Sequence, residues 1–328
     1  MREHTIGAQR EVESPSKFEV YKKIALTSEI ARNGLLKPEH VAYCMAWRDE
    51  VNPDSRPISV LYGGMGADVS TVFLTTDAEV VIGVDYEEIN RERLEGFLED
   101  YDQIDSYLGQ HRLEKKHGLP WTYKGKSENE IFEEDMRLRS ERGFYEVGVF
   151  ERWSAERLLF VELKKMGVDK DSLSLGSDPS GIFLEFVWSY PSIPITPPRK
   201  RRVYFRTSYI HDIMELDNIP VLDCYYQKSA ILAGVPTEML RNLVQKKMNP
   251  FATVLVGTSF ADNVPKDRRQ LVREFKGVFA EGQVEPLRIP MDFTKAMIGL
   301  NRDLPNESES LISNYAYGWH LTGARMKT

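Results

Sequence analysis

The sequence is poor in cysteine, has no long apolar run and shows no histidine pattern of a metal site. Its 328 residues contain two cysteines, Cys44 and Cys224, and Cys224 falls in an apolar stretch typical of a reduced core thiol. No apolar stretch approaches about 18 residues, so no membrane-spanning helix is expected. The six histidines lack metal-ligand spacing, and no metal is expected. These absences, together with an N-terminus that lacks the apolar core of a signal peptide, predict a cytoplasmic protein.

Positive charge is also in short supply. The chain has 43 Lys and Arg residues against 50 Asp and Glu residues, which gives a net charge of −7. An acidic surface provides no electrostatic reason to bind nucleic acid. The single basic run, Arg199 to Arg202, is expected to be the solvated start of a strand. The expected partner is a small-molecule substrate, with no nucleic acid and no membrane, and the oligomeric state is open.

The order of apolar runs and turns predicts an α/β fold with a doubly wound parallel sheet. Residues 1–57 repeat apolar residues at helical spacing and are predicted to form an N-terminal helical cap. From residue 58 to residue 328, short apolar strands alternate with helices, which predicts one Rossmann-like domain. A polar stretch at about 103–150 is predicted to be an insertion in this domain. Two consecutive strands at about 182–208 are predicted to form a hairpin that extends the sheet edge.

The stretch SVLYGGMGADVSTVFL, from Ser59 to Leu74, predicts a ligand-binding turn. Three glycines follow a buried strand, and a helix with Asp68 in its first turn is predicted to begin at Ala67. A glycine turn between strand and helix lets a ligand approach backbone N–H groups closely. Asp85 ends the next strand, 22 residues after Gly63, where an acid accepts hydrogen bonds from both ribose hydroxyls. The combination predicts a nucleoside site.

Two nucleoside ligands, a dinucleotide and S-adenosylmethionine, compete for this site. The dinucleotide pattern has a third glycine that allows close packing of helix and strand, and here that position is Val69. A pyrophosphate at the helix N-terminus would also be repelled by the carboxylate of Asp68. S-adenosylmethionine carries no phosphate and has a positive sulfonium, which Asp68 does not oppose. The residues therefore favour S-adenosylmethionine over NAD.

The motifs VLYGGMGAD and VIGVDYEE resemble the first two motifs of class I S-adenosylmethionine-dependent methyltransferases. The resemblance implies a Rossmann-like methyltransferase sheet of seven strands, the last antiparallel, and implies S-adenosylmethionine as the cofactor. It also implies that Asp212 hydrogen-bonds the adenine amino group and that the N–H of Ile213 meets the ring. Two positions depart from the pattern, with Tyr62 in place of the leading acid and Asp68 in place of the last glycine. The cofactor-binding residues implied are Tyr62, Gly63, Gly64, Met65, Gly66, Asp85, Tyr86, Asp212 and Ile213.

Candidate catalytic residues lie at the carboxyl end of the fourth core strand, in the sequence YYQ. Ligands in open α/β sheets bind outside the carboxyl ends of the strands, so Tyr226 and Gln227 are expected to face the reactive end of the cofactor. His211 is a candidate base because its neighbour Asp212 is expected at the cofactor. Asp223, within the same strand, stands where the family often has an acid. Methyl transfer from a sulfonium needs alignment of donor and acceptor more than covalent help.

The function predicted is an S-adenosylmethionine-dependent methyltransferase that acts on a small molecule. The alternative is an enzyme that attacks the aminocarboxypropyl chain of the cofactor, including cyclisation to azetidine-2-carboxylate with release of methylthioadenosine. Tyr62 motivates this alternative, because an altered pose of the methionine end would expose that chain to attack. A binding module without activity and a dehydrogenase are further readings, the last disfavoured by Asp68 and Val69.

Overall fold

A computed structural model provides the structure of the chain. It describes residues 16–65, 68–85, 89–104, 155–193, 196–207, 219–227, 242–243, 246–259, 284–302 and 319–326. The predicted insertion falls almost entirely outside these ranges. The division of the chain at residue 57 stays a prediction.

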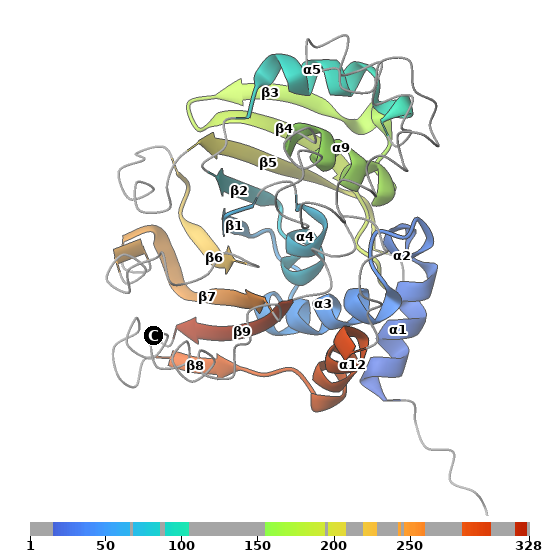
Figure 1. The fold of residues 1–328 in the computed structure, drawn as a ribbon. Coiled ribbons are helices and arrows are strands. Elements are labelled where there is room, and N and C mark those ends of the chain that lie inside the picture. Colours follow the sequence, from blue (N-terminus) through green and yellow to red (C-terminus); the bar gives the residue numbers. More distant parts are fainter. Residues whose placement is uncertain are drawn as a thin grey trace, which may run out of the picture.

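The core is one nine-stranded mixed sheet with the order β3-β4-β5-β2-β1-β6-β7-β9-β8 (Figure 1). Neighbouring strands are parallel from β5 through β2, β1 and β6 to β7. Strand β9 runs antiparallel to both β7 and β8, and β3 and β4 add an antiparallel pair beside β5. The strands are β1 Ser59–Gly63, β2 Val80–Asp85, β3 Ser174–Asp178, β4 Gly181–Trp188, β5 Arg199–Thr207, β6 Leu222–Gln227, β7 Met248–Ser259, β8 Val284–Leu287 and β9 Trp319–Met326.

This sheet confirms the predicted fold class. Seven strands, from β5 to β8 in the sheet order, form the expected Rossmann-like arrangement, and the last strand of the chain, β9, is antiparallel as expected. The predicted pairing of β4 with β5 is present, but β5 is itself the third parallel strand of the core. The sheet edge is therefore extended by β4 and β3. Strand β3, with sequence SLGSD, lacks an apolar run and was not predicted.

The described helices pack against one face of the sheet (Figure 1). Their hydrophobic cluster includes Tyr62 of β1 and Tyr226 of β6, whereas Leu61 and Tyr225 belong to a second cluster on the opposite face. This alternation follows from the two-residue repeat of a strand. The helices are α1 Lys17–Thr27, α2 Glu29–Arg32, α3 Pro38–Val51, α4 Ser70–Thr76, α5 Arg91–Glu99, α9 Ala155–Lys165 and α12 Met291–Arg302, with short 3₁₀ turns at Tyr101–Gln103 and Lys170–Ser172.

The predicted N-terminal helices are present and share the core of the sheet. Helix α3 buries eight consecutive residues, from His40 to Trp47. The hydroxyl of Tyr43 accepts a hydrogen bond from the backbone N–H of Leu321 in β9 at 2.9 Å. The start of the chain is thereby tied to its last strand through α3.

Helix α4 begins later than predicted. It starts at Ser70 with Val69 as its N-cap, so Asp68 precedes the helix and does not lie in its first turn. The Oδ1 atom of Asp68 nevertheless accepts a hydrogen bond from the backbone N–H of Thr71 at 3.3 Å. Its carboxylate therefore remains at the helix N-terminus, where a negative charge is favourable.

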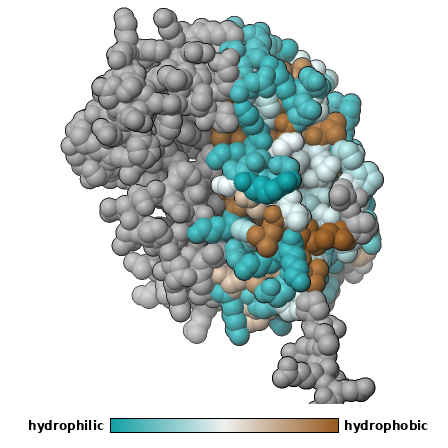
Figure 2. Space-filling model, turned by 90° about the vertical axis from the view of Figure 1, so that its right-hand side faces the viewer, coloured by the Kyte–Doolittle hydropathy of each residue, from teal (hydrophilic) through white to brown (hydrophobic). Residues whose placement is uncertain are grey.

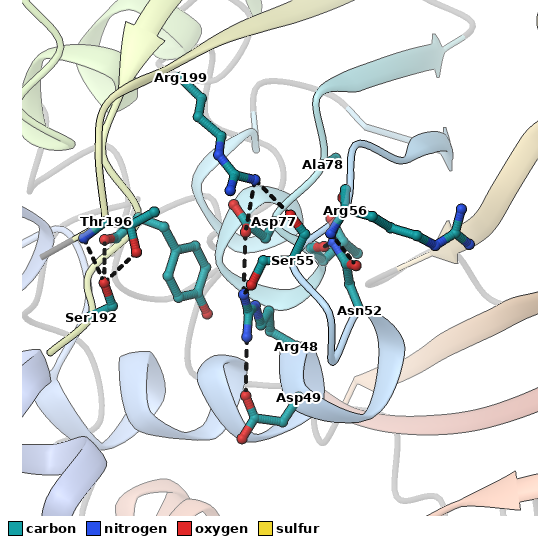
Figure 3. Close-up of polar contacts among 12 residues, drawn as sticks. Arg48, Asp49, Asn52, Ser55, Arg56, Asp77, Ala78, Ser192, Thr196 and Arg199 are labelled. Atoms are coloured by element: carbon teal, nitrogen blue, oxygen red, sulfur yellow. Dashed lines mark hydrogen bonds and ion pairs between the residues drawn. The ribbon is translucent and has the colours of Figure 1, made fainter. Parts of the chain in front are cut away.

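The basic run begins strand β5, as predicted, but it is solvated only in part, since Lys200 is exposed and Arg201 is buried. Arg201 is 1% exposed, and its Nη2 lies 2.5 Å from Oδ1 of Asp77, which is equally buried. Arg48 and Arg199 approach the other oxygen of Asp77 at 3.4 and 4.0 Å, and both arginines also contact Ser55 (Figure 3). Lys200 and Arg202 pair with Glu185 of β4. Because side chains alternate along β5, the first and third residues of the run pair with Asp77, and the second and fourth pair with Glu185.

One further prediction of composition, the buried thiol, is confirmed within the described residues. Cys224 is a buried free thiol, as predicted, and burial raises its pKa to about 12. Every described helix is too short or too polar to cross a lipid bilayer. On the face that Figure 2 presents, hydrophobic residues are interspersed with hydrophilic ones.

Candidate functional site

The sheet has a topological switch point between β1 and β6. From β1 the chain adds β2 and β5 on one side, and β6 and β7 lie on the other side. Ligands of open α/β sheets bind in the crevice outside the carboxyl ends of the two strands where the order reverses. Here those ends carry Tyr62 and Gly63 on β1 and Tyr226 and Gln227 on β6. The predicted glycine turn and two predicted catalytic residues therefore meet at one place.

The glycine turn after β1 is held by the neighbouring strand. Gly64 has a φ of 65°, in the left-handed region that favours glycine. The backbone N–H groups of Gly64 and Met65 donate to the carbonyl of Val84 at 2.9 and 3.4 Å. A Cβ atom on Gly83 would lie 2.4 Å from Sδ of Met65, so the buried Met65 side chain depends on glycine at this point of β2.

The N-terminus of α4 is closed by a carboxylate from another helix. Oε2 of Glu162, on α9, accepts hydrogen bonds from the backbone N–H groups of Val69 and Ser70 at 2.8 and 2.9 Å. Glu162 is buried, with 8% of its surface exposed. In dinucleotide-binding folds, N–H groups at this helix N-terminus receive the pyrophosphate. In this chain they are already engaged by a negative group.

A chain of hydrogen bonds joins the ends of β1 and β6 through α4. The hydroxyl of Tyr226 donates to Oγ1 of Thr71 at 3.3 Å, and Thr71 donates to Oδ2 of Asp68 at 2.6 Å. The hydroxyl of Tyr62 donates to the same oxygen at 2.9 Å. The two tyrosine rings meet edge to face, with centroids 4.7 Å apart. Asp68 thus fixes both aromatic side chains at the switch point.

The pKa values of both tyrosines lie well above their ordinary range. Burial is the main cause for each, and the carboxylate of Asp68 adds to it. Glu162 contributes to the raised pKa of Tyr62 as well. Both phenols are therefore protonated at neutral pH, and the potential from these carboxylates at Tyr62 favours positive charge.

Gln227 lies on the opposite face of the sheet from Tyr226. Its Oε1 accepts a hydrogen bond from the hydroxyl of Tyr225 at 2.9 Å. Its side chain is fully buried, and its Nε2 has no hydrogen-bond acceptor within the described part of the chain. Buried polar groups of folded proteins are hydrogen-bonded in the great majority, so this amide calls for an explanation.

Of the other predicted site residues, one lies near the switch point, one lies away from it, and the rest are outside the described residues. Asp85 ends β2, next to β1 in the sheet, where the apolar pattern predicted the end of this strand. Asp223 is the second residue of β6, at the opposite end of the strand, and is partly buried. There it accepts hydrogen bonds from the N–H of Ser59 and from Asn249, and it pairs with Arg56. Gly66, Tyr86, His211, Asp212 and Ile213 lie outside the described residues.

Glu162 and Thr71 are the site residues that sequence reasoning missed. Glu162 stands among the apolar residues of α9, next to Val161 and Leu163. An acid on the buried face of a helix needs a partner in the core, and this requirement is the signal from which a contact could have been predicted. Its partner, the N-terminus of α4, is 92 residues away in the chain and was not identifiable from spacing.

No family model matches the chain, and no curated protein matches it. Several solved structures resemble it at 9 to 10% identity. A phosphoethanolamine N-methyltransferase of Haemonchus contortus, in complex with phosphoethanolamine and S-adenosylhomocysteine, aligns over 85% of this chain and 38% of its own with a TM-score of 0.36. The plantazolicin methyltransferase BpumL, in complex with S-adenosylhomocysteine, aligns over 96% and 91% with a TM-score of 0.34.

A third matched structure is the [4+2]-cyclase SpnF, at 10% identity and a TM-score of 0.34, over 87% of this chain and 81% of its own. The chain spans less than half the length of three matched proteins, because the alignments cover 47%, 38% and 48% of those chains. At these TM-scores the likeness carries no argument about activity. The fold assignment rests on the strand order and directions described above.

Proposed function

We propose that the chain is an S-adenosylmethionine-dependent methyltransferase that acts on a small molecule. The observation that carries this proposal is the closure of the α4 N-terminus by Glu162 beside the glycine turn at the switch point. A nucleoside ligand with a pyrophosphate would have to displace a buried carboxylate from the N–H groups it needs. A nucleoside ligand with a positive sulfonium meets no such conflict.

The residues present fit this cofactor. Asp85 is proposed to accept hydrogen bonds from the ribose hydroxyls, and the turn formed by Gly63, Gly64 and Met65 to pass along the ligand. The aromatic side chains of Tyr62 and Tyr226 offer rings to a cation. Gly66, Tyr86, Asp212 and Ile213 complete the proposed set. When bound, the cofactor would supply an activated methyl group.

The raised pKa of Tyr226 supports an orienting role for this residue. A phenol that stays protonated at neutral pH does not act as a general base, so Tyr226 is proposed to orient groups at the switch point through its hydroxyl and ring. A displacement reaction depends mainly on the alignment of the methyl donor with the acceptor. His211 stays the proposed base for acceptors that must lose a proton.

The alternative reaction, attack on the aminocarboxypropyl chain, is favoured by one observation. Tyr62 occupies the position of the leading acid of the family motif, and its hydroxyl is bound to Asp68. A neutral tyrosine carries no charge of its own to pair with the cofactor's ammonium group, and the nearest carboxylate, that of Asp68, lies beyond it. A different pose of the methionine end would follow, and with it a different reactive carbon.

Calorimetric titration tests the cofactor. S-adenosylmethionine and S-adenosylhomocysteine are expected to bind, and NAD, as the matched control, is expected not to bind. If neither S-adenosyl compound binds, the proposal is overturned. Tight binding of NAD would instead favour the dehydrogenase hypothesis. Incubation with S-adenosylmethionine alone, followed by chromatography, separates the two reactions. Release of methylthioadenosine supports the alternative, and turnover to S-adenosylhomocysteine with added acceptors supports methyl transfer.

A further inference from the structure

The side-chain amide of Gln227 is a hydrogen-bond donor without an acceptor in the described part of the chain. Its Oε1 is engaged by Tyr225, and this contact fixes the orientation of the amide. Both N–H bonds of Nε2 then lack an acceptor in a side chain with no exposed surface. A buried donor in this state destabilises the protein unless a water or a ligand completes it.

Its place in the fold distinguishes this donor from two buried guanidinium nitrogens, the Nε atoms of Arg48 and Arg201. Within the described residues these atoms also lack acceptors, but each belongs to a guanidinium whose remaining nitrogens donate to protein oxygens. Those arginines lie near the amino ends of the strands. Gln227 is the last residue of β6, at the carboxyl end and at the switch point, where ligands of this fold bind.

Among the described residues, the two sides of the switch point differ in charge. On the side of α4, the carboxylates of Asp68 and Glu162 raise the pKa of Tyr62 and so disfavour a second negative group there. On the other side, Gln227 offers an uncharged donor. For a ligand that ends in both an ammonium and a carboxylate group, this difference favours the carboxylate on the side of Gln227.

We propose that Nε2 of Gln227 donates a hydrogen bond to the carboxylate of the amino-acid end of S-adenosylmethionine. This inference rests on the proposed function, because it takes the cofactor from there. It makes Gln227 a residue that selects cofactors with an intact amino-acid end.

The probes that test it are S-adenosylhomocysteine, which keeps the amino-acid end, and methylthioadenosine, which lacks it. The variant is Gln227→Met in a Tyr225→Phe background, since that background removes the hydroxyl that would otherwise lose its acceptor. The ratio of the two dissociation constants is expected to shift by about tenfold against S-adenosylhomocysteine relative to Tyr225→Phe alone. The ligand-free double variant is expected to melt no lower than Tyr225→Phe, because an unpartnered donor has been removed.

An unchanged ratio, with both probes still bound, overturns the inference and leaves the proposed function standing. Absence of binding of both probes to the wild-type chain overturns the proposed function and the inference with it. Should the double variant fail to fold, Gln227→Glu provides the second test, because it keeps an oxygen for Tyr225. Its second oxygen is expected to weaken S-adenosylhomocysteine selectively, and equal weakening of both probes counts against the proposal.

Discussion

The two ends of the central sheet differ in how their buried polar groups are paired. Near the amino ends of the strands, Asp77 pairs with the guanidinium groups of Arg48 and Arg199 (Figure 3) and with that of the buried Arg201. At the carboxyl ends, Asp68 and Glu162 accept hydrogen bonds from hydroxyl and backbone N–H donors, and Gln227 presents a donor that has no acceptor among the residues the structure describes.

The difference separates what holds the fold together from what is arranged for a ligand. Opposite charges at the amino end compensate each other, and removal of one partner leaves an uncompensated buried charge. The carboxyl end coincides with the switch point, where polar groups serve a ligand as well as the fold. Substitutions at the first end are expected to change stability alone, and substitutions at the second to change ligand affinity as well.

The largest effect is expected from Asp77→Asn. Asparagine tolerates the φ of 53° at this position, so the substitution removes the charge with little change in backbone strain. The loss of the buried partner of Arg201 is expected to lower the free energy of unfolding by about 3–5 kcal/mol, measured by urea denaturation. Glu95→Gln, which breaks an exposed pair with Arg91, is the control and is expected to cost less than about 0.5 kcal/mol. A loss at Asp77 no larger than the control's would show that the arginines do not depend on this carboxylate.

At the carboxyl end, Glu162→Ala is expected to have the next largest effect. Two backbone N–H groups of α4 lose their acceptor, at an expected cost of about 2–3 kcal/mol in unfolding free energy. Glu162→Gln keeps an acceptor oxygen without the charge and is expected to retain most of the stability. If charge at this point excludes phosphate, Glu162→Gln binds adenosine diphosphate more tightly than the wild type does in calorimetry. Equal affinities would remove Glu162 as the reason for cofactor choice.

Tyr62→Phe is expected to lower the free energy of unfolding by about 1.5 kcal/mol at pH 7, because a hydrogen bond to a carboxylate is lost. Its effect on pH dependence is more specific. The pKa of Tyr62 is raised in the folded state, so its contribution to stability is complete below about pH 10, the pKa in the unfolded chain, and is lost as the pH rises toward the folded value.

Stability measured from pH 9 to pH 11 is accordingly expected to fall less steeply in Tyr62→Phe, by up to about 1.4 kcal/mol per pH unit. Tyr226→Phe provides a second case, since its pKa is raised mainly by burial. Parallel curves for wild type and both variants would contradict the buried, protonated state of these tyrosines.

The fold was accessible from sequence because buried parallel strands are continuous apolar runs bounded by turns, as in ISVLY and EVVIGVD. The polar edge strand Ser174–Asp178 has no such run, and helix Met291–Arg302 was not identified from its pattern. At the site, the glycine turn and the end of β6 were found because strand ends mark the switch point. Glu162 was missed because its contact with α4 depends on how α9 packs, which local spacing does not encode.

Asp223 is a residue that the sequence suggested for the site but that lies away from it. Its substitution is expected to have the smallest effect on stability. The family resemblance drew attention to it as an acid of the fourth core strand, yet its carboxylate binds the N–H of Ser59 at 2.9 Å, at the end of the sheet away from the switch point. Asp223→Asn is expected to cost about 1 kcal/mol in unfolding free energy, since one oxygen remains to accept that hydrogen bond. S-adenosylhomocysteine affinity is expected to stay at the wild-type value in calorimetry. A substantial loss of affinity at unchanged stability would mean that the amino end of β6 takes part in ligand binding, and the separation of the two ends would fail.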